Sequence, residues 1–195
     1  MNEIFSPHLV LAKNYWAAHL KPGDAAIDAT CGNGHDTLYL SRLLLQNENS
    51  LVVGLDIQGI AIQNTDFLLH QSLDIEQRKR VLLQRICHSK ISDIPLPFPP
   101  RLIVYNLGYL PGGDKTIVSK TNTSLQSLEN ALSLVALDGA VSIMCYPGHE
   151  EGEREEKALL AYLESLPSNR WTICYHKWLN RPRSPTLIWI KRTGP

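Results

Sequence analysis

Short apolar segments alternate with amphipathic ones along most of this 195-residue chain, and this order constrains the fold more than any other feature. The apolar segments have the length of buried strands and lie at residues 25–29, 51–55, 80–86, 102–105 and 139–145. Segments with helical spacing of apolar residues lie at about 7–20, 36–45, 59–72, 123–137 and 151–165. This alternation predicts an α/β fold with a mostly parallel sheet and helices on both faces.

The last two strand segments break the alternation. They lie at residues 171–178 and 187–192, and the single loop between them is too short for a parallel crossover. They therefore predict an antiparallel hairpin at one side of the sheet, which brings the expected number of strands to seven. Since no linker, repeat or low-complexity tract divides the chain, we expect one domain over residues 1–195.

A glycine-rich turn, Gly32-Asn33-Gly34, follows the first buried strand, where parallel sheets bind their ligands. The dinucleotide fingerprint would need a glycine at Thr37, which disfavours nicotinamide and flavin enzymes. The spacing instead resembles the first motif of Rossmann-like S-adenosylmethionine methyltransferases, an acid followed by G-x-G-x-G, with Thr30 in place of the first glycine. Asp28 is then expected to orient the loop or to meet the ammonium group of the cofactor. An ordinary strand-to-helix turn is the alternative.

Two further strand ends carry polar side chains that suit a nucleoside. Asp56 ends the second strand, where a carboxylate can accept hydrogen bonds from both ribose hydroxyls. Cys87 and His88 follow the third strand, a usual place for contacts with adenine. A solvated loop residue is the alternative interpretation of His88.

The loop after the fourth strand, Asn106 to Lys115, reads NLGYLPGGDK. Nitrogen-methylating enzymes often carry a polar residue, an apolar pair and an aromatic here, and Asn106 resembles that polar residue. Its side-chain oxygen would accept a hydrogen bond from an amine and aim the lone pair, so that positioning supplies much of the rate. Tyr109 would stack on a base, a contact worth about 1–3 kcal/mol. A plain connection with Tyr109 in the core is the alternative.

The segment after the fifth strand, Tyr146 to Gly152, reads YPGHEEG and is expected at the same edge of the sheet. His149 would contact substrate, serve as a base, or begin a helix whose first turn is acidic. The three glutamates that follow are expected on a solvated helix face, at Glu153, Glu155 and Glu156.

The segments DATCGNGHDT, GLDIQ, NLGYLPGGDK and YPGHEEG, in this order and near these spacings, together resemble the bacterial family labelled "putative rRNA methylases". The resemblance spans roughly residues 6–192. Members are class I methyltransferases associated with tRNA, which methylate the amine of 5-aminomethyl-2-thiouridine at the wobble position. The resemblance thus implies a Rossmann-like class I fold, S-adenosylmethionine as cofactor, and tRNA as partner through its anticodon arm. No metal or membrane is expected, and a homodimer is compatible.

The resemblance also implies which residues form the site. Those expected at the cofactor are Asp28, Thr30, Cys31, Gly32, Asn33, Gly34, Asp36, Thr37, Asp56, Ile57, Gln58, Cys87, His88 and Asn106. Asn106 and Tyr109 are expected to be catalytic, and no dedicated base is needed because a neutral alkylamine is already a good nucleophile. Those expected at the substrate are Leu110, Pro111, Gly112, Asp114, Lys115, Tyr146 and His149. The distribution of charge adds Arg181 and Arg183 to the residues expected at the substrate. Three positions depart from the family pattern, Cys31, Cys87 and Pro147.

Charge is distributed unevenly along the chain. The 19 basic and 19 acidic residues cancel, which disfavours a protein that coats nucleic acid by bulk charge. Glu164 is nevertheless the last acid, and six basic residues follow it, Arg181 and Arg183 within the hairpin loop. We therefore expect a local phosphate contact there, with a solvated basic edge strand as the alternative.

The four cysteines, Cys31, Cys87, Cys145 and Cys174, form no C-x-x-C pair, and we expect them to be reduced and packed as small hydrophobes. Together with an N-terminus that lacks signal-peptide features, this indicates a cytoplasmic protein. Two other functions stay open: methylation of rRNA or of a small-molecule amine, and a non-catalytic RNA-binding module.

Overall fold

A seven-stranded sheet forms the centre of the protein, with the strand order β3-β2-β1-β4-β5-β7-β6. The structure, a computed structural model, describes residues 7–113 and 118–195. The strands are β1 (Ala25–Asp28), β2 (Leu51–Asp56), β3 (Val81–Arg85), β4 (Leu102–Asn106), β5 (Ala140–Cys145), β6 (Trp171–His176) and β7 (Thr186–Arg192). The helices are α1 (Pro7–His19), α2 (His35–Leu44), α3 (Gly59–Ser72), α4 (Ile75–Arg78), α5 (Thr121–Leu134), α6 (Glu150–Glu164) and the 3₁₀ helix η1 (His88–Asp93).

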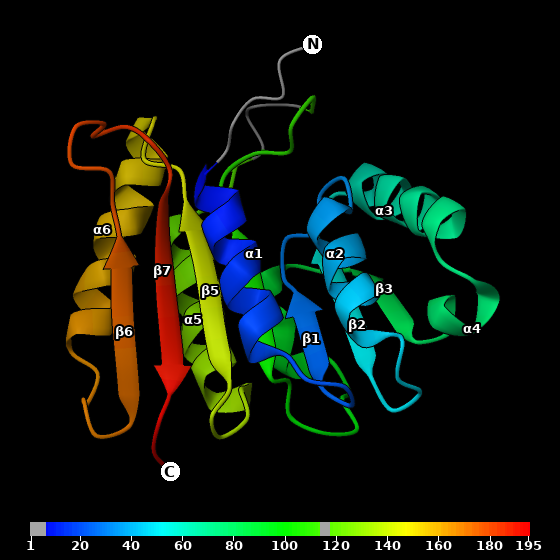
Figure 1. Ribbon diagram of the computed structural model, residues 1–195. Coiled ribbons are helices and arrows are strands. Elements are labelled where there is room, and N and C mark those ends of the chain that lie inside the picture. Colours follow the sequence, from blue (N-terminus) through cyan, green and yellow to red (C-terminus); the bar gives the residue numbers. More distant parts are fainter. Residues whose placement is uncertain (1–6, 114–117) are drawn as a thin grey trace.

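The first five strands are parallel, and β7 runs antiparallel to both β5 and β6 (Figure 1). This confirms the predicted sheet with its hairpin at one side. The chain moves outward from β1 to β2 and β3 and then returns to place β4 on the other side of β1. At such a reversal the loops beyond the carboxyl ends of β1 and β4 part in opposite directions and leave a crevice for a ligand.

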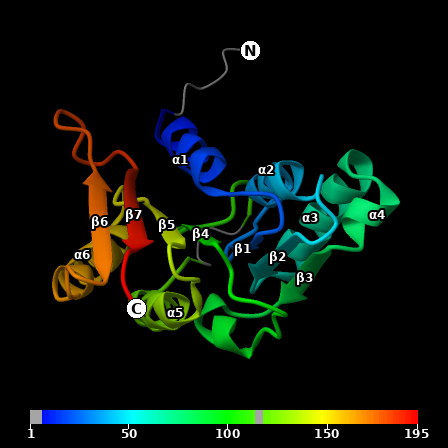
Figure 2. The same ribbon diagram turned by 60° about the horizontal axis from the view of Figure 1, so that its bottom comes forward.

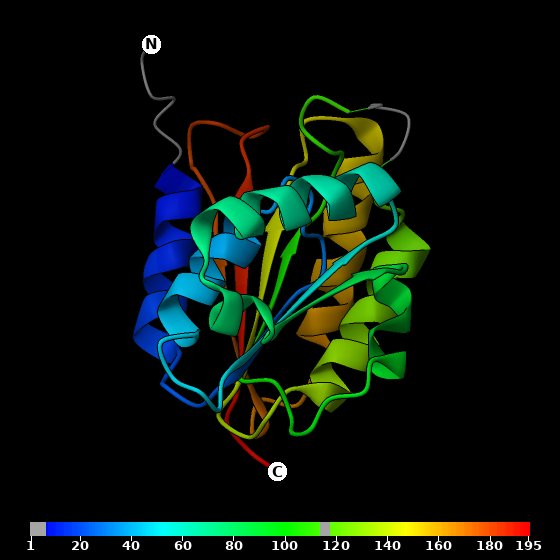
Figure 3. The same cartoon turned by 90° about the vertical axis from the view of Figure 1, so that its right-hand side faces the viewer.

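Helices cover both faces of the sheet. One face carries α1, α2 and α3, and the other carries α5, α6 and the η1 segment (Figures 2 and 3). Two apolar clusters fill the spaces between the layers; one joins Leu128 of α5 and Leu159 of α6 to the sheet, and the other joins Trp16 of α1 and Leu40 of α2 to it. The central strands are buried on both faces, which explains their unbroken apolar sequences.

Helix α1 docks on the hairpin side of the sheet through aromatic side chains. Trp16 is 2 % exposed, and its indole Nε1 donates a hydrogen bond to Ser142 Oγ on β5 over 2.9 Å. Tyr15 stacks on Trp189 of β7, with 5.0 Å between the ring centroids. These contacts hold α1 across β5 and β7, with its first turns near the carboxyl end of β5.

Helix α5 differs from the expected 123–137 at both ends. It begins earlier because Glu151 of α6 accepts hydrogen bonds from the backbone N–H and the hydroxyl of Thr121, which satisfies the first turn of α5. It ends at Leu134 because Val135 turns into the core and Asp138 takes a positive φ of 60° ahead of β5. The first helical turn is therefore set by another helix.

The short helices α4 and η1 were not expected from the periodicity. Helix α4 begins at a capping box in which Asp74 and Gln77 satisfy each other's backbone N–H groups. The prediction for Cys174 was also wrong, since it is exposed on the edge strand β6, whereas Cys31 and Cys145 are buried. No helix among the described residues is long and apolar enough to cross a membrane.

Candidate functional site

A cavity of about 1800 Å³ opens at the carboxyl edge of the sheet. The loops after β1, β2, β3, β4 and β5 contribute to its wall, and α1 and the hairpin loop close its sides. Figure 3 shows the loop after β4, the start of α6 and the hairpin loop rising from the same end of the sheet. The cavity therefore lies at the strand reversal, where the topology predicts a ligand.

The glycine-rich turn after β1 forms the floor of the cavity. Asp28 lies beneath it with no exposed surface; its carboxylate accepts hydrogen bonds from the backbone N–H of Thr30 over 3.3 Å and from the Thr37 hydroxyl over 2.6 Å. Burial raises the pKa of Asp28 to about 7, with the nearby Asp36 adding to the shift. Of its two expected roles, the geometry favours orienting the loop, because Asp28 is not on the cavity wall.

Gly34 shows why this turn needs glycine. Its φ is +83°, and a Cβ there would lie 2.8 Å from the Thr65 Cα of α3. Helix α3 thus approaches the turn too closely for any side chain at this position. Its neighbours Gly32 and Asn33 line the cavity.

Asp56 stands at the end of β2 with its carboxylate held from two sides. Oδ2 accepts a hydrogen bond from the Gly32 N–H over 3.0 Å, and Oδ1 accepts one from the Gln58 N–H over 2.8 Å. Burial nevertheless raises the pKa of Asp56 from its ordinary value. A carboxylate offers about four lone-pair positions, so it can still accept a hydrogen bond from a hydroxyl group of a ligand in the cavity.

His88 lies at the start of η1, on the cavity wall, with its ring edge-on to Tyr105 at 6.0 Å. Burial lowers its pKa to about 4, so the imidazole is neutral at pH 7. Its Nδ1 is buried and, within the described residues, has no hydrogen-bond partner. An orphaned polar atom of this kind is typical of a position that a ligand completes.

Asn106 ends β4 and is fixed at both its backbone and its side chain. Its backbone N–H donates to Thr30 Oγ1 over 2.7 Å, and its Nδ2 donates to Asp36 Oδ2 over 2.7 Å. The bond to Asp36 identifies the nitrogen of the amide. Among the described residues, Oδ1 has only a 3.5 Å contact from the Tyr146 hydroxyl. Asn106 therefore presents an acceptor oxygen at the cavity wall.

The loop after β4 folds over the turn after β1. Leu110 is 7 % exposed and packs near Gly32, and Asn33 Nδ2 donates to the Pro111 carbonyl over 3.1 Å. Tyr109 is 43 % exposed on the cavity wall, which excludes the alternative that it belongs to the core. The expected substrate residues Asp114 and Lys115 lie outside the described residues.

His149 caps helix α6. Its Nδ1 accepts a hydrogen bond from the Gly152 N–H over 3.0 Å, so in the neutral ring the proton sits on Nε2. Nε2 is buried and, among the described residues, unpartnered. The helix-start interpretation therefore agrees with the geometry, and the ring has no free nitrogen lone pair with which to act as a base.

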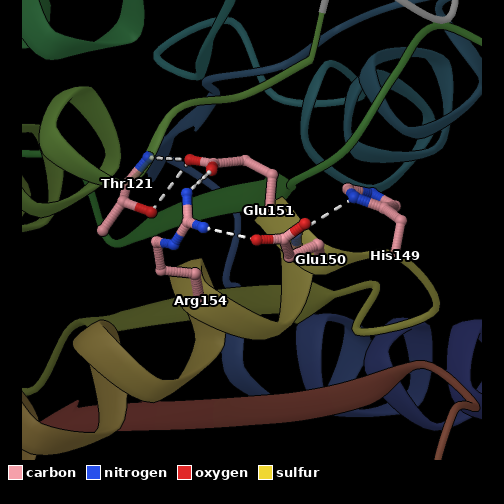
Figure 4. A network of polar contacts seen from close by, with 6 residues as sticks. Thr121, His149, Glu150, Glu151 and Arg154 are labelled. Carbon is pink, nitrogen blue, oxygen red and sulfur yellow. Dashed lines mark hydrogen bonds and ion pairs between the residues drawn. The ribbon is translucent and has the colours of Figure 1, made fainter.

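The acidic first turn of α6 holds neighbouring segments in place. In Figure 4, Arg154 bridges Glu150 and Glu151 at 2.8 Å each, while Glu151 also holds Thr121. These contacts join the start of α6 to the start of α5, next to the loop that covers the cavity.

The prediction of a solvated face was wrong for two of the three glutamates. Glu155 is 2 % exposed and accepts hydrogen bonds from Ser119 and Ser124, and Glu156 is 8 % exposed and accepts one from Tyr175. Both face inward because α6 packs against α5 and the hairpin with this side. Glu153 is exposed, as expected.

Most of the residues expected at the site meet at this one cavity. Its wall includes Thr30, Cys31, Gly32, Asn33, Asp36, Asp56, Ile57, Gln58, Cys87, His88, Asn106, Tyr109, Leu110, Pro111, Gly112, Tyr146, His149 and Arg183. Asp28, Gly34 and Thr37 lie behind the wall, and Arg181 is exposed in the hairpin loop away from it.

Sequence reasoning missed several residues of the wall, among them Leu9 and Lys13 of α1 and Ser119 and Lys120 after the β4 loop. Lys13 Nζ forms an ion pair with Asp36 Oδ1 over 3.1 Å. Local sequence offers no signal for it, because a lysine on an amphipathic helix is ordinarily solvated.

Comparison with known proteins agrees with this fold. The family model described as "Putative rRNA methylase" matches residues 52–192. The chain belongs to this family. The chain is also 36 % identical over 179 residues to the chloroplastic tRNA (mnm(5)s(2)U34)-methyltransferase of Arabidopsis thaliana. The aligned region covers 90 % of this chain. The chain spans 65 % of the length of that relative.

Two solved structures share the whole architecture of this chain. The Clostridium thermocellum protein of the same description is 31 % identical with a TM-score of 0.88, and the match covers 95 % of this chain and 97 % of that one. A Streptococcus mutans protein solved in complex with SAH is 28 % identical with a TM-score of 0.83, and the match covers 97 % and 99 %. The fold is that of class I methyltransferases.

Proposed function

We propose that this chain is an S-adenosylmethionine-dependent N-methyltransferase that converts 5-aminomethyl-2-thiouridine to 5-methylaminomethyl-2-thiouridine at the wobble position of tRNA. The relationship to the Arabidopsis thaliana enzyme supports the substrate, and the SAH complex of the Streptococcus mutans relative supports the cofactor. The observation that carries the proposal is the amide of Asn106, which its hydrogen bond to Asp36 fixes at the cavity wall.

The residues of the cavity suit the proposed cofactor. Gly32 brings the backbone of the turn to the cavity wall, and Asp56 would accept hydrogen bonds from the ribose hydroxyls. The Nδ1 of His88, which has no partner among the described residues, would lie beside adenine. S-adenosylmethionine supplies an electrophilic methyl group when it is bound. The protein then has to hold the amine in line with that methyl and to exclude water.

Asn106 would orient the amine. Its Oδ1 would accept a hydrogen bond from one N–H of the amine, and this bond would turn the nitrogen lone pair toward the cofactor. Because the nucleophile is neutral before transfer, no strong base is needed, and the proton released from the product passes to solvent. The absence of a strong base agrees with the geometry of His149. Its Nδ1 accepts the hydrogen bond that caps α6, and its Nε2 carries the proton of the neutral ring.

The RNA side of the site would combine stacking with local charge. Tyr109 is half-exposed on the wall, where a base of the anticodon arm would stack. Residues 177–183 of the hairpin loop are all exposed, Leu179 entirely so, and Arg183 reaches the cavity wall. We assign Arg181 and Arg183 to backbone phosphates, which position an RNA without reading its sequence.

The homodimer, the single domain over residues 1–195 and the cytoplasmic location expected from the sequence belong to the same proposal. The four free cysteines support a reducing compartment. Sedimentation of the purified chain tests the dimer, and imaging of a tagged chain tests the location.

The decisive experiment is reconstitution. The purified chain is incubated with S-adenosylmethionine and an anticodon stem-loop RNA that carries 5-aminomethyl-2-thiouridine, and the nucleosides are measured by mass spectrometry. We expect the methylaminomethyl nucleoside to form, and the same RNA with plain uridine to stay unchanged. Methylation of rRNA or of a free amine instead would contradict the proposal, and failure to bind S-adenosylmethionine in a calorimetric titration would favour an RNA-binding module.

Asn106→Ala is expected to lower turnover about 100-fold, the scale of loss that follows from a misplaced nucleophile. Cofactor affinity is measured alongside. Asn49→Ala, at an exposed asparagine before β2, serves as the matched control. Full turnover of Asn106→Ala with unchanged cofactor affinity would rule out the orienting role.

A further inference from the structure

Lys13 connects helix α1 to the reacting end of the cavity. Its Nζ lies 3.1 Å from Asp36 Oδ1 and 5.1 Å from the centroid of the Tyr39 ring, while the Tyr39 hydroxyl donates to the Lys13 carbonyl. The Lys13 side chain is 29 % exposed and that of Asp36 is 14 %. The lysine is therefore held at its backbone carbonyl by Tyr39, and at its ammonium group by Asp36 and the Tyr39 ring.

Asp36 divides its two oxygens between Lys13 and Asn106. Oδ1 takes the ammonium of Lys13, and Oδ2 accepts the hydrogen bond from Asn106 Nδ2 over 2.7 Å. A single carboxylate thus stands between a lysine on α1 and the amide that faces the cavity. As a member of an ion pair, Asp36 places a negative charge beside the Asn106 amide.

A negatively charged carboxylate next to Asn106 would disfavour the reactive form of the substrate amine. A negative charge within about 4–6 Å of an amine raises the pKa of that amine by stabilising its ammonium form. Only the neutral amine has a lone pair with which to attack a methyl group. A bare Asp36 would therefore hold Asn106 correctly and hinder the nucleophile at the same time.

Among the groups around Asp36, Lys13 is the one that compensates its negative charge. Two acidic groups interact with Asp36. Burial, with a smaller contribution from Asp36, raises the pKa of Asp28 to about 7 and that of Tyr146 to about 12. His8, against the Tyr146 ring, has its pKa lowered by burial and is uncharged at pH 7. Among the described residues, Lys13 is the only cation in an ion pair with Asp36.

We propose that Lys13 is a positioning residue that neutralises Asp36, so that this carboxylate orients Asn106 without trapping the substrate amine as an ammonium ion. The inference rests on the proposed function, because it concerns an amine nucleophile. It assigns to the N-terminal helix a part in the chemistry.

The test is the pH dependence of single-turnover methyl transfer to the aminomethyl stem-loop. Lys13→Met is expected to move the inflection of the rate profile about one pH unit higher, so that the rate at pH 7 falls about 10-fold and returns toward wild type at high pH. Lys13→Arg is expected to keep the wild-type profile. The double variant Lys13→Met/Asp36→Asn removes both charges, and its inflection should return to the wild-type position even where its plateau is lower.

Binding supplies a second readout that does not need turnover. Lys13→Met is expected to prefer the aminomethyl RNA over the same RNA with 5-methyl-2-thiouridine about 10-fold more strongly than wild type does, since the bare carboxylate attracts the ammonium. Lys79→Met, which removes an exposed lysine from its ion pair with Glu76 at the end of α4, is the matched control and should change neither readout.

Two results would overturn the inference. One is a Lys13→Met profile that is lowered equally at every pH, which indicates a merely structural role, and the other is a profile and an RNA preference that are both unchanged. Loss of the proposed function is recognised separately, because wild type itself would then leave the aminomethyl RNA unmethylated.

Discussion

Asp28 is a carboxyl group with no exposed surface directly beneath the ligand-binding turn. Its two hydrogen bonds orient Thr30 and Thr37, and burial without a cation raises its pKa to about 7. The unfolded chain has a pKa near 4 at such a group. The native state therefore holds the proton more tightly, and this stabilisation is complete below pH 4 and is lost as the pH rises through 7.

This titration predicts a pH-dependent gap between wild type and Asp28→Asn. Between pH 4 and 7 the unfolding free energy of wild type should fall relative to that of Asp28→Asn by about 1 kcal/mol for each pH unit. Urea unfolding of the cofactor-free proteins at several pH values measures the gap, and groups common to both proteins cancel. Parallel stability curves would show that Asp28 does not titrate in this range.

At the scale of elements, α1 matters because its docking decides where Lys13 lies. Trp16 anchors the helix with a buried indole and a hydrogen bond to Ser142. The apolar cluster around it includes Ala12 and Leu40, so removing the ring leaves a cavity between helix and sheet. A shift of α1 would also draw Lys13 away from Asp36.

Trp16→Ala is expected to lower the free energy of unfolding by about 3–5 kcal/mol, the usual loss for a truncated core tryptophan. Trp178→Ala, at the half-exposed tryptophan of the hairpin loop, is the matched control and should cost less than about 0.5 kcal/mol. Denaturant unfolding measures both. Equal losses would mean that α1 is not anchored through Trp16.

At the scale of the whole molecule, the distribution of charge matters more than its total. The chain is neutral overall, yet Arg181 and Arg183 stand in an exposed loop at the same end of the sheet as the cavity (Figure 3). A folded RNA that reaches the cavity would therefore meet positive charge at its rim. Contacts of this kind release counterions and make binding salt-dependent.

Arg181→Glu/Arg183→Glu is expected to weaken binding of the stem-loop and to reduce the slope of log affinity against log salt by about 0.7–0.9 for each lost phosphate contact. The cofactor affinity should stay unchanged. Arg42→Glu/Lys79→Glu alters the net charge equally on exposed residues away from the cavity and should preserve the slope. An unchanged slope for Arg181→Glu/Arg183→Glu would support the alternative that this basic segment is merely solvated. Unaffected turnover would favour a small-molecule substrate.

The order of strands and helices, the parallel sheet with its closing hairpin and the main loops of the site follow from the sequence itself. Strand and helix periodicities are local, so helix 59–72 could be predicted to the residue. The motifs stand at strand ends, and parallel strands bring their carboxyl ends to one edge of a sheet. Asp56, His88 and Asn106 could therefore be assigned to one site before their distances were known.

Only the tertiary structure decided which side chains meet across that edge. Asn106 and Asp36 are 70 residues apart, Lys13 arrives from a helix that precedes every motif, and Glu151 caps a helix other than its own. The inward turn of Glu155 and the tautomer of His149 likewise depend on packing partners. Such contacts produce no periodic pattern in the sequence, because they depend on how separate elements pack against one another. That packing is determined by the core as a whole.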